Sequence, residues 1–287
     1  MKLTVLTVII VAGCSLAARA GMPVDFVPDN EIVVKVWPDG APNSNFTTLS
    51  VEDSIEWNAV SEPVLHIFPA ANPVGKVVLM CPGGGYRHLG VRNEGYSFVP
   101  WYNEQGVDVA VLQYRMPYGH PDVPLSDVHQ SMRLLRERFP SSLVGIQGFS
   151  AGGHLASMAA THYNDRTTRP DFQILFYPVI AVSGPAAHVG SSQRLLGENP
   201  TAEMQRLYNN HLQVTADTPQ AFIVHSSDDS IVPVANSLDY YSALVANGVA
   251  AAMHIYPTGD HGWGFARGFT YFPAWTSELA LWISTLK

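Results

Sequence analysis

The chain has 287 residues, of which 47% are hydrophobic and 14% charged, a composition typical of a globular protein with a sizeable core. Its 16 Lys and Arg against 24 Asp and Glu give a formal net charge of −8. Because binding to a phosphate backbone needs clustered cations, this balance argues against a nucleic-acid partner and favours a neutral substrate.

The first 20 residues have the pattern of an export signal. Lys2 precedes an apolar run that is too short to cross a bilayer, and Ala18-Arg19-Ala20 matches a signal-peptide cleavage pattern. Val11-Ala12-Gly13-Cys14 also resembles a lipoprotein box, in which Cys14 is acylated, so two interpretations compete. Both predict an exported protein, which is periplasmic, secreted or an outer-membrane lipoprotein. Both also leave Cys81 without a disulfide partner, and any membrane contact would come through the N-terminal lipid.

The segment from residue 21 to residue 48 is rich in Pro, Asn and Asp around a short strand expected at residues 32–36. We expect residues 21–60 to form an N-terminal arm on a single domain that spans residues 21–287. No repeat, low-complexity tract or long linker divides this part of the chain.

Beyond the arm, apolar runs of strand length alternate with amphipathic segments of helix length. The expected strands are Val64–Phe68, Lys76–Met80, Val107–Gln113, Leu143–Gln147, Phe172–Tyr177, Ala221–His225 and Ala251–Tyr256. The expected helices are Tyr96–Glu104, Ser126–Arg138, Gly152–His162, Ala202–His211, Val234–Asn247 and Ala274–Leu286. This alternation predicts an α/β protein with a doubly wound, mostly parallel sheet and helices on both faces. Ligands bind such sheets at the carboxyl ends of the strands.

A serine follows the strand Leu143–Gln147 in the pattern Gly148-Phe149-Ser150-Ala151-Gly152. A G-x-S-x-G pattern between a strand and a helix is typical of a nucleophile elbow, a strained turn that lifts the serine hydroxyl above the sheet. A side chain at Gly148 or Gly152 would collide with the neighbouring strand and helix. We therefore predict that Ser150 is the nucleophile of an α/β-hydrolase fold.

Glycines also follow the strand Lys76–Met80, in the run Cys81-Pro82-Gly83-Gly84-Gly85-Tyr86. Attack on an ester carbonyl builds negative charge on its oxygen, and backbone N–H groups stabilise that charge without reorganising. Glycine lets the backbone approach the substrate closely. We predict an oxyanion hole formed by the N–H groups of Gly84, Gly85 and Ala151.

The acid should follow the second strand after the elbow, because the α/β-hydrolase order is Ser, then Asp or Glu, then His. The strand Ala221–His225 is followed by two candidates, Asp228 and Asp229. The spacing to Val232-Pro233 favours Asp229 as the acid and makes Asp228 a turn or capping residue.

The base should follow the next strand, Ala251–Tyr256. His261 lies there in a glycine-rich loop, and among the 11 histidines it alone has both the expected order and the expected loop. His154, His225 and His254 are expected to be packing residues. The predicted catalytic residues are therefore Ser150, Asp229 and His261.

Several motifs resemble those of bacterial acetyl-xylan esterases and feruloyl-esterase-like α/β-hydrolases. They are the run from Val77 to Tyr86, Asn93-Glu94-Gly95, Val111 to Pro117, Gly148 to His154, Asp229 to Pro233 and Pro257 to Gly264. The match covers roughly residues 62 to 287. The resemblance implies an exported bacterial enzyme that removes acetyl groups from hemicellulose, with neither cofactor nor metal. Its partners would be small or polysaccharide esters.

Substrate contacts are less clearly indicated. Tyr86 and Trp263 are expected near the site, where aromatic faces can stack on sugars, although plain packing would also explain them. Glu94 could hold the oxyanion loop or contact a sugar hydroxyl, and the sequence leaves both open. The insertion Ile180–Thr218 has room for at most a small cap and is expected to wall the acyl pocket.

Three alternatives remain at this stage. A feruloyl esterase would need a wide aromatic pocket. An exopeptidase-like serine hydrolase usually carries an added β-propeller or a substantial lid, for which this chain has no room. A binding protein without catalysis would be expected to have a degraded triad, whereas all three positions are filled here.

Overall fold

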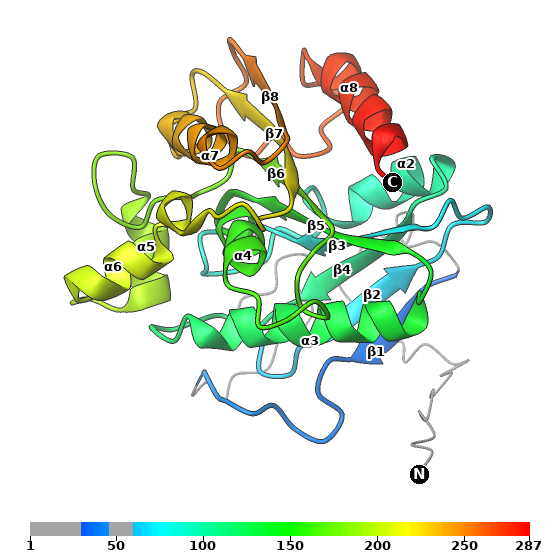
Figure 1. Ribbon diagram of the computed structural model, residues 1–287, viewed down its shortest axis with the longest axis horizontal. Coiled ribbons are helices and arrows are strands. Elements are labelled where there is room, and N and C mark those ends of the chain that lie inside the picture. The colour runs from blue at the N-terminus through cyan, green and yellow to red at the C-terminus, as the bar shows by residue number, and fades with distance from the viewer. Residues whose placement is uncertain (1–29, 46–59) are drawn as a thin grey trace.

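The computed structural model of the chain describes residues 30–45 and 60–287 (Figure 1). Within these residues the strands form an eight-stranded sheet in the order β1-β2-β4-β3-β5-β6-β7-β8. The strands are β1 (Ile32–Lys35), β2 (Val64–Phe68), β3 (Lys76–Cys81), β4 (Asp108–Gln113), β5 (Leu143–Phe149), β6 (Phe172–Phe176), β7 (Gln220–Ser226) and β8 (Ala251–Tyr256). The predicted segment 1–20 and most of the arm lie outside the described residues.

The sheet is mostly parallel. All neighbours from β4 to β8 in this order pair in parallel, whereas β1 with β2 and β2 with β4 pair antiparallel at one end. The central strands are buried along nearly their whole length, which explains why each is a continuous apolar run rather than an alternating one. Because these strands run in the same direction, their carboxyl ends open on one edge of the sheet.

Helices cover both faces of the sheet, as predicted (Figure 1). The helices are α2 (Val99–Glu104), α3 (Asp122–Arg138), α4 (Ser150–Thr161), α5 (Val189–Leu196), α6 (Ala202–Tyr208), α7 (Ala235–Ala246) and α8 (Phe272–Thr285), with short 3-10 turns η2 (Tyr96–Phe98) and η3 (Asn210–Gln213). The helices α3, α4 and α7 cover one face. On the other face α8 lies beside α2, where the Trp275 ring packs against Phe98 and Trp101.

The largest differences from the expected helices are in α3 and α5. Helix α3 begins at Asp122, four residues before its predicted start, with Pro124 in its first turn. Proline is tolerated there because the first N–H groups of a helix have no intrahelical partner. Helix α5 was not predicted as a helix. It lies in the insertion Ile180–Thr218 together with α6 and η3, so this insertion is a small helical cap at the side of the sheet.

A buried ion pair attaches the described part of the arm to the sheet. Arg115, just after β4, donates to Asp127 of α3 at 2.6 Å, and both side chains are almost fully buried. The Trp37 indole donates to the same carboxylate at 2.8 Å, and Arg115 also donates to the Asn43 carbonyl at 2.7 Å. The arm is therefore held by charge and hydrogen bonds as well as by strand β1.

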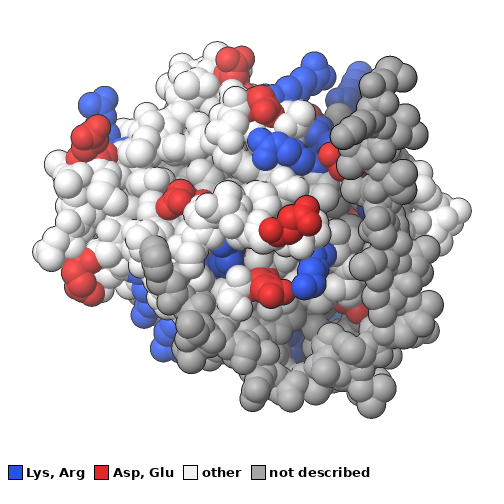
Figure 2. Space-filling model, turned by 90° about the horizontal axis from the view of Figure 1, so that it is seen from below, with Lys and Arg blue, Asp and Glu red and all other residues white. Residues whose placement is uncertain are grey.

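The charge distribution on the surface and the hydrophobicity of the helices are two further features of the described residues. On the face in Figure 2, acidic and basic side chains are interspersed rather than gathered by sign. Over residues 30–45 and 60–287, no helix combines the length and the apolar character that crossing a membrane requires.

Candidate active site

Ser150 occupies a strained turn between β5 and α4. Its φ of 52° lies in the left-handed region that non-glycine residues rarely adopt, and α4 begins at this residue. The side chain is largely buried, and the N-terminus of α4 favours negative charge beside it. The strand–turn–helix context predicted for the elbow is present.

The glycines of the elbow have the steric reason that the sequence suggested. A Cβ on Gly148 would lie 2.2 Å from the carbonyl oxygen of Gly152 in α4. A Cβ on Gly152 would lie 2.1 Å from the carbonyl oxygen of Cys81 at the end of β3. Both contacts are with backbone atoms, which cannot move aside, so any larger residue would force the turn open.

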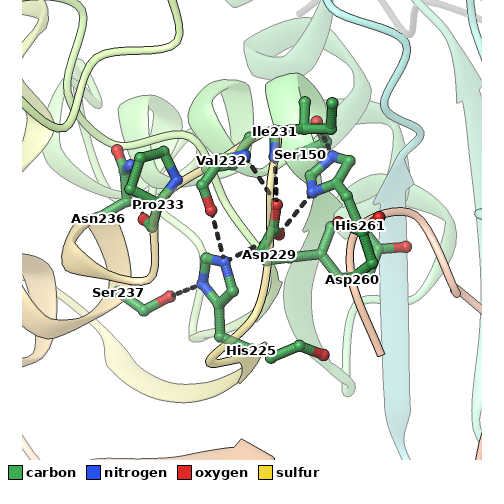
Figure 3. A network of polar contacts seen from close by, with 12 residues as sticks. Ser150, His225, Asp229, Ile231, Val232, Pro233, Asn236, Ser237, Asp260 and His261 are labelled. Carbon is green, nitrogen blue, oxygen red and sulfur yellow. Dashed lines mark hydrogen bonds and ion pairs between the residues drawn. The ribbon is translucent and has the colours of Figure 1, made fainter. Parts of the chain in front are cut away.

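The structure brings Ser150, His261 and Asp229 together in one chain of hydrogen bonds (Figure 3). The His261 Nδ1–H donates to Asp229 Oδ2 at 2.7 Å, and the Ser150 hydroxyl donates to His261 Nε2 at 2.8 Å. Both distances are within the range for strong hydrogen bonds. The chain of contacts can therefore pass a proton from the hydroxyl to the imidazole while the carboxylate stabilises the resulting charge.

Asp229 is the better of the two aspartate candidates because it alone contacts His261. Its Oδ1 accepts the N–H groups of Ile231 at 3.0 Å and Val232 at 2.8 Å. Burial raises the pKa of Asp229, but hydrogen bonds from His225 and His261 and the nearby imidazole charge outweigh it. The net pKa lies well below the usual value, so the side chain is an anion at neutral pH.

Asp228 and Asp260 brace the two loops that carry the acid and the base. Asp228 accepts the N–H groups of Gly259 and Asp260 at 3.2 and 2.9 Å. In return, Asp260 accepts the N–H and hydroxyl of Ser230 at 2.9 and 2.7 Å. These reciprocal contacts hold His261 at a set distance from Asp229. Asp228 thus stabilises these loops by accepting backbone N–H groups, a role similar to that of the turn or capping residue expected from the sequence.

The glycine loop after β3 lies next to the elbow. A Cβ on Gly83 would come within 3.0 Å of Ser150 Cβ, and Gly84 and Gly85 have φ of 126° and 64°, conformations that favour glycine. Ala151, the third predicted donor, is the second residue of α4, so its N–H has no intrahelical partner. All three predicted residues therefore lie around the nucleophile.

Glu94 holds this loop in place, which is one of the two roles that the sequence left open. Its Oε2 accepts the Gly83 N–H at 2.8 Å, and its Oε1 accepts the Tyr177 hydroxyl at 2.8 Å. The Tyr177 oxygen in turn accepts the Gly264 N–H at 2.9 Å. Burial raises the pKa of Glu94, although these hydrogen bonds oppose the rise. Glu94 thus links the glycine loop to the loop of His261.

A cavity of about 320 Å³ opens at this place. Its lining consists of Gly84, Gly85, His88, Gly90, Asn93, Glu94, Ser150, His188, Ile231, His261 and Gly262. Ile231 is the single aliphatic side chain in this lining, which contains no Phe, Tyr or Trp. His188 comes from the insertion Ile180–Thr218, so that segment walls part of the cavity as expected.

Tyr86 and Trp263, predicted as substrate contacts, do not line this cavity. Tyr86 is 1% exposed, and its hydroxyl lies 3.0 Å from His154 Nδ1. Trp263 is 6% exposed, stacks on Phe269 and donates to the Ser226 hydroxyl at 3.0 Å. Both rings are core residues, because their polar atoms have partners inside the protein.

Sequence reasoning missed three residues around the site. His225, expected only to pack, lies 3.1 Å from Asp229 Oδ2 through its Nε2. Tyr177 contacts the His261 ring edge-on at 4.8 Å between centroids. The Asn93 amide donates to the Gly262 carbonyl at 3.0 Å. Two of them carry a signal that could have been used, since His225 and Tyr177 lie at the carboxyl ends of β7 and β6.

The described residues contain no group of three or more His, Cys, Asp or Glu side chains that could hold a metal ion. Cys81 is a free, buried thiol whose pKa burial raises, so it is an unreactive group.

The order of the three residues along the chain separates this site from unrelated serine hydrolases. The serine comes first, the aspartate follows β7 and the histidine follows β8, whereas chymotrypsin and subtilisin use other orders. The sheet and the site together define an α/β-hydrolase.

Within this class the chain belongs to the BD-FAE family, whose family model matches residues 67–244. An acetylxylan esterase of Xylanibacter ruminicola is 37% identical over 228 residues, which are 76% of this chain and 47% of that protein. Endo-1,4-beta-xylanase B of Butyrivibrio fibrisolvens is 33% identical over 218 residues, covering 69% of this chain and 34% of that protein. The chain therefore spans half or less of the length of these two relatives.

A solved structure is similar over nearly its whole length. It is the acetyl ester-xyloside bifunctional hydrolase from Caldicellulosiruptor lactoaceticus, with a TM-score of 0.75 and 35% sequence identity. The similarity covers 88% of this chain and 95% of that one. The α/β-hydrolase fold predicted from the sequence is thus confirmed, as is the resemblance to acetyl-xylan esterases.

Gly152→Ala tests the steric account of the elbow. The added methyl group would lie against the backbone at the end of β3, so we expect a loss of about 1–3 kcal/mol in the free energy of unfolding. Gly268→Ala is the matched control, because nothing lies within 4 Å of its added Cβ. Chemical denaturation measures both. Equal stability of the two variants would contradict the close approach of α4 and β3.

Proposed function

We propose that this protein is a serine carboxylesterase that removes acetyl groups from xylan or another hemicellulose. The observation that carries the proposal is the hydrogen-bonded chain from Ser150 through His261 to Asp229, open to a cavity beside a glycine loop. Each group is of the type and at the distance that acyl transfer needs.

The proposed reaction begins with the Ser150 hydroxyl. His261 Nε2 takes its proton as the oxygen attacks the ester carbonyl, and Asp229 stabilises the imidazolium that forms. His261 then protonates the leaving sugar oxygen as its bond to the acetyl carbon breaks, which releases the deacetylated sugar and leaves an acetyl group on Ser150. Water, deprotonated by the same imidazole, attacks this acyl-enzyme, and His261 returns the proton to the Ser150 oxygen as acetate departs.

The glycine loop supplies the proposed oxyanion hole. We assign it to the N–H groups of Gly84 and Gly85, which line the cavity beside Ser150, and of Ala151, the second residue of α4. The dipole of α4 adds favourable potential for a developing negative charge. Glu94 accepts the Gly83 N–H and so directs the loop. Because Glu94 already accepts two hydrogen bonds from the protein, we assign it to loop geometry rather than to proton transfer.

The lining of the cavity supports an acetyl group in preference to a larger acyl group. Glycines form much of the wall, and one aliphatic side chain, Ile231, faces it. A feruloyl group would need a broad apolar surface, which this lining does not supply. The remaining side chains, among them Asn93 and His188, are polar and suit sugar hydroxyls.

The relatives support a carbohydrate ester as the substrate. Their names connect them to acetylated xylan, to the xylan backbone and to acetyl esters and xylosides. We propose that this chain acts on the same class of polymer or on oligosaccharides derived from it.

Ser150→Ala should lower kcat by about four to six orders of magnitude, because the attacking oxygen is lost. Release of p-nitrophenol from p-nitrophenyl acetate measures this rate. The control is Ser227→Ala, an exposed serine near the site that should keep the parental rate. A Ser150→Ala protein that retains the parental rate would overturn the assignment of the nucleophile.

An acyl series tests the substrate. We expect kcat/KM to be highest for p-nitrophenyl acetate and to fall by roughly tenfold or more at octanoate, because longer chains meet the glycine wall. Acetate should be released from acetylated xylan, with methyl ferulate a poor substrate. Faster turnover of methyl ferulate than of the acetyl ester would favour a feruloyl esterase.

We also propose that the protein is exported, on the basis of the pattern in residues 1–20. Mass spectrometry of the full-length chain produced in a bacterial host should find a mature N-terminus at Gly21 or an acylated Cys14. Cys14→Ser distinguishes the two, because it abolishes acylation but leaves the Ala18-Arg19-Ala20 site. An intact Met1 on active protein in the cytosol would count against export.

A further inference from the structure

Asp229 contacts a second imidazole besides that of His261. The Nε2 of His225, at the carboxyl end of β7, lies 3.1 Å from Asp229 Oδ2, the same oxygen that accepts the His261 Nδ1–H (Figure 3). The proposed reaction does not use His225, which is fully buried and so reaches neither solvent nor substrate.

Hydrogen bonds surround the carboxylate on every side. Oδ1 accepts two backbone N–H groups, from Ile231 and Val232, and Oδ2 accepts the two imidazoles. The Asp229 side chain is 0% exposed, so water cannot replace a lost donor. Each donor therefore helps to decide where Oδ2 points and how strongly it holds a proton.

The neighbours of His225 determine which of its nitrogens carries the proton. Its Nε2 lies 3.0 Å from the Val232 carbonyl as well as 3.1 Å from Asp229, and both of these oxygens can only accept. Nε2 is therefore protonated. Nδ1 lies 2.7 Å from the hydroxyl of Ser237, a buried residue of α7, which can donate to it. The ring is held at both nitrogens.

We propose that His225 is a positioning residue of the esterase reaction, whose Nε2–H holds the Asp229 carboxylate toward His261 and keeps it in the ionised form. The inference rests on the proposed function. With His225 included, the hydrogen-bonded chain of the site continues into the core, from Asp229 through His225 to Ser237. A histidine that only filled space in the core would need no donor aimed at the carboxylate.

The charges around Asp229 agree with this assignment. Burial alone would raise the pKa of Asp229, and the hydrogen bond from His225 is among the contacts that bring the pKa below its usual value. The titratable groups that face Asp229 are His225 on β7, His261 and Asp260 in the loop after β8, Tyr177 after β6 and His188 before α5.

The sign of the expected pH effect follows from these contacts. Without the His225 donor, the Asp229 anion shares its charge with one hydrogen bond fewer, so it attracts the His261 Nδ1–H more strongly and favours the imidazolium. His261 in this form cannot accept the Ser150 proton. The acidic limb of the kcat/KM profile therefore moves to higher pH when His225 cannot donate.

Two amide variants separate a positioning role from simple packing. His225→Gln places an amide N–H near the position of Nε2, whereas the shorter His225→Asn can reach Ser237 but not Asp229. For His225→Asn we expect kcat/KM for p-nitrophenyl acetate to fall about tenfold and the acidic limb to rise by roughly half a pH unit. His225→Gln should restore most of both. His254→Gln on β8 is the control, because its ring packs on Phe222 and should leave the profile unchanged.

If the Asn and Gln variants match each other, whether both keep or both lose the parental profile, the inference is wrong. If His225→Asn does not fold, Ser237→Ala decides the question by removing the partner of Nδ1. We expect that variant to move the acidic limb in the same direction by a smaller amount, and an unchanged limb overturns the inference. A parental protein without activity on p-nitrophenyl acetate would instead refute the proposed function, so the two failures are distinguishable.

Discussion

A fully buried carboxylate, that of Asp229, is the group on which the geometry of the site depends. An isolated anion in such a place would be strongly unfavourable, and this one is stabilised because two backbone N–H groups and two imidazoles donate to it. The same hydrogen bonds both stabilise the charge of the carboxylate and fix its orientation. The carboxylate orients the His261 ring by accepting its Nδ1–H, and the ring in turn accepts the Ser150 hydroxyl.

Several residues around Asp229 have a strained backbone conformation. Of the non-glycine residues at positive φ, Ser150, Tyr177 and Asp260 all lie at the site or in direct contact with it. Each follows a strand of the parallel sheet, where the chain must turn sharply to place a polar group above the edge. The glycine loop held by Glu94 completes the rim, because its backbone approaches Ser150 closely at Gly83.

Local patterns predicted much of this correctly. The strands were found nearly to the residue because a parallel sheet buried on both faces demands continuous apolar runs. The positions of Ser150, Asp229 and His261 followed from the same topology, since each lies after a strand whose carboxyl end meets the common edge. Helix α5 was missed because its first half holds Gly190, Ser191 and Ser192, residues of low helix propensity. Tyr86 and Trp263 were assigned to the cavity from closeness in sequence, but both rings are buried in the core, where their polar atoms have partners.

The sequence by itself determined the succession of strands and of most helices along the chain, the elbow and the residues able to form a hydrogen-bonded triad. These depend on local periodicity and on steric limits at glycine. Only the tertiary structure decided what Glu94 and His225 contact and which residues line the cavity. Those properties arise where side chains distant in sequence meet: Glu94 bonds Gly83 and Tyr177, and His225 bonds Asp229 and Ser237. No pattern along the chain records the direction of a buried side chain, because packing between separate elements sets that direction.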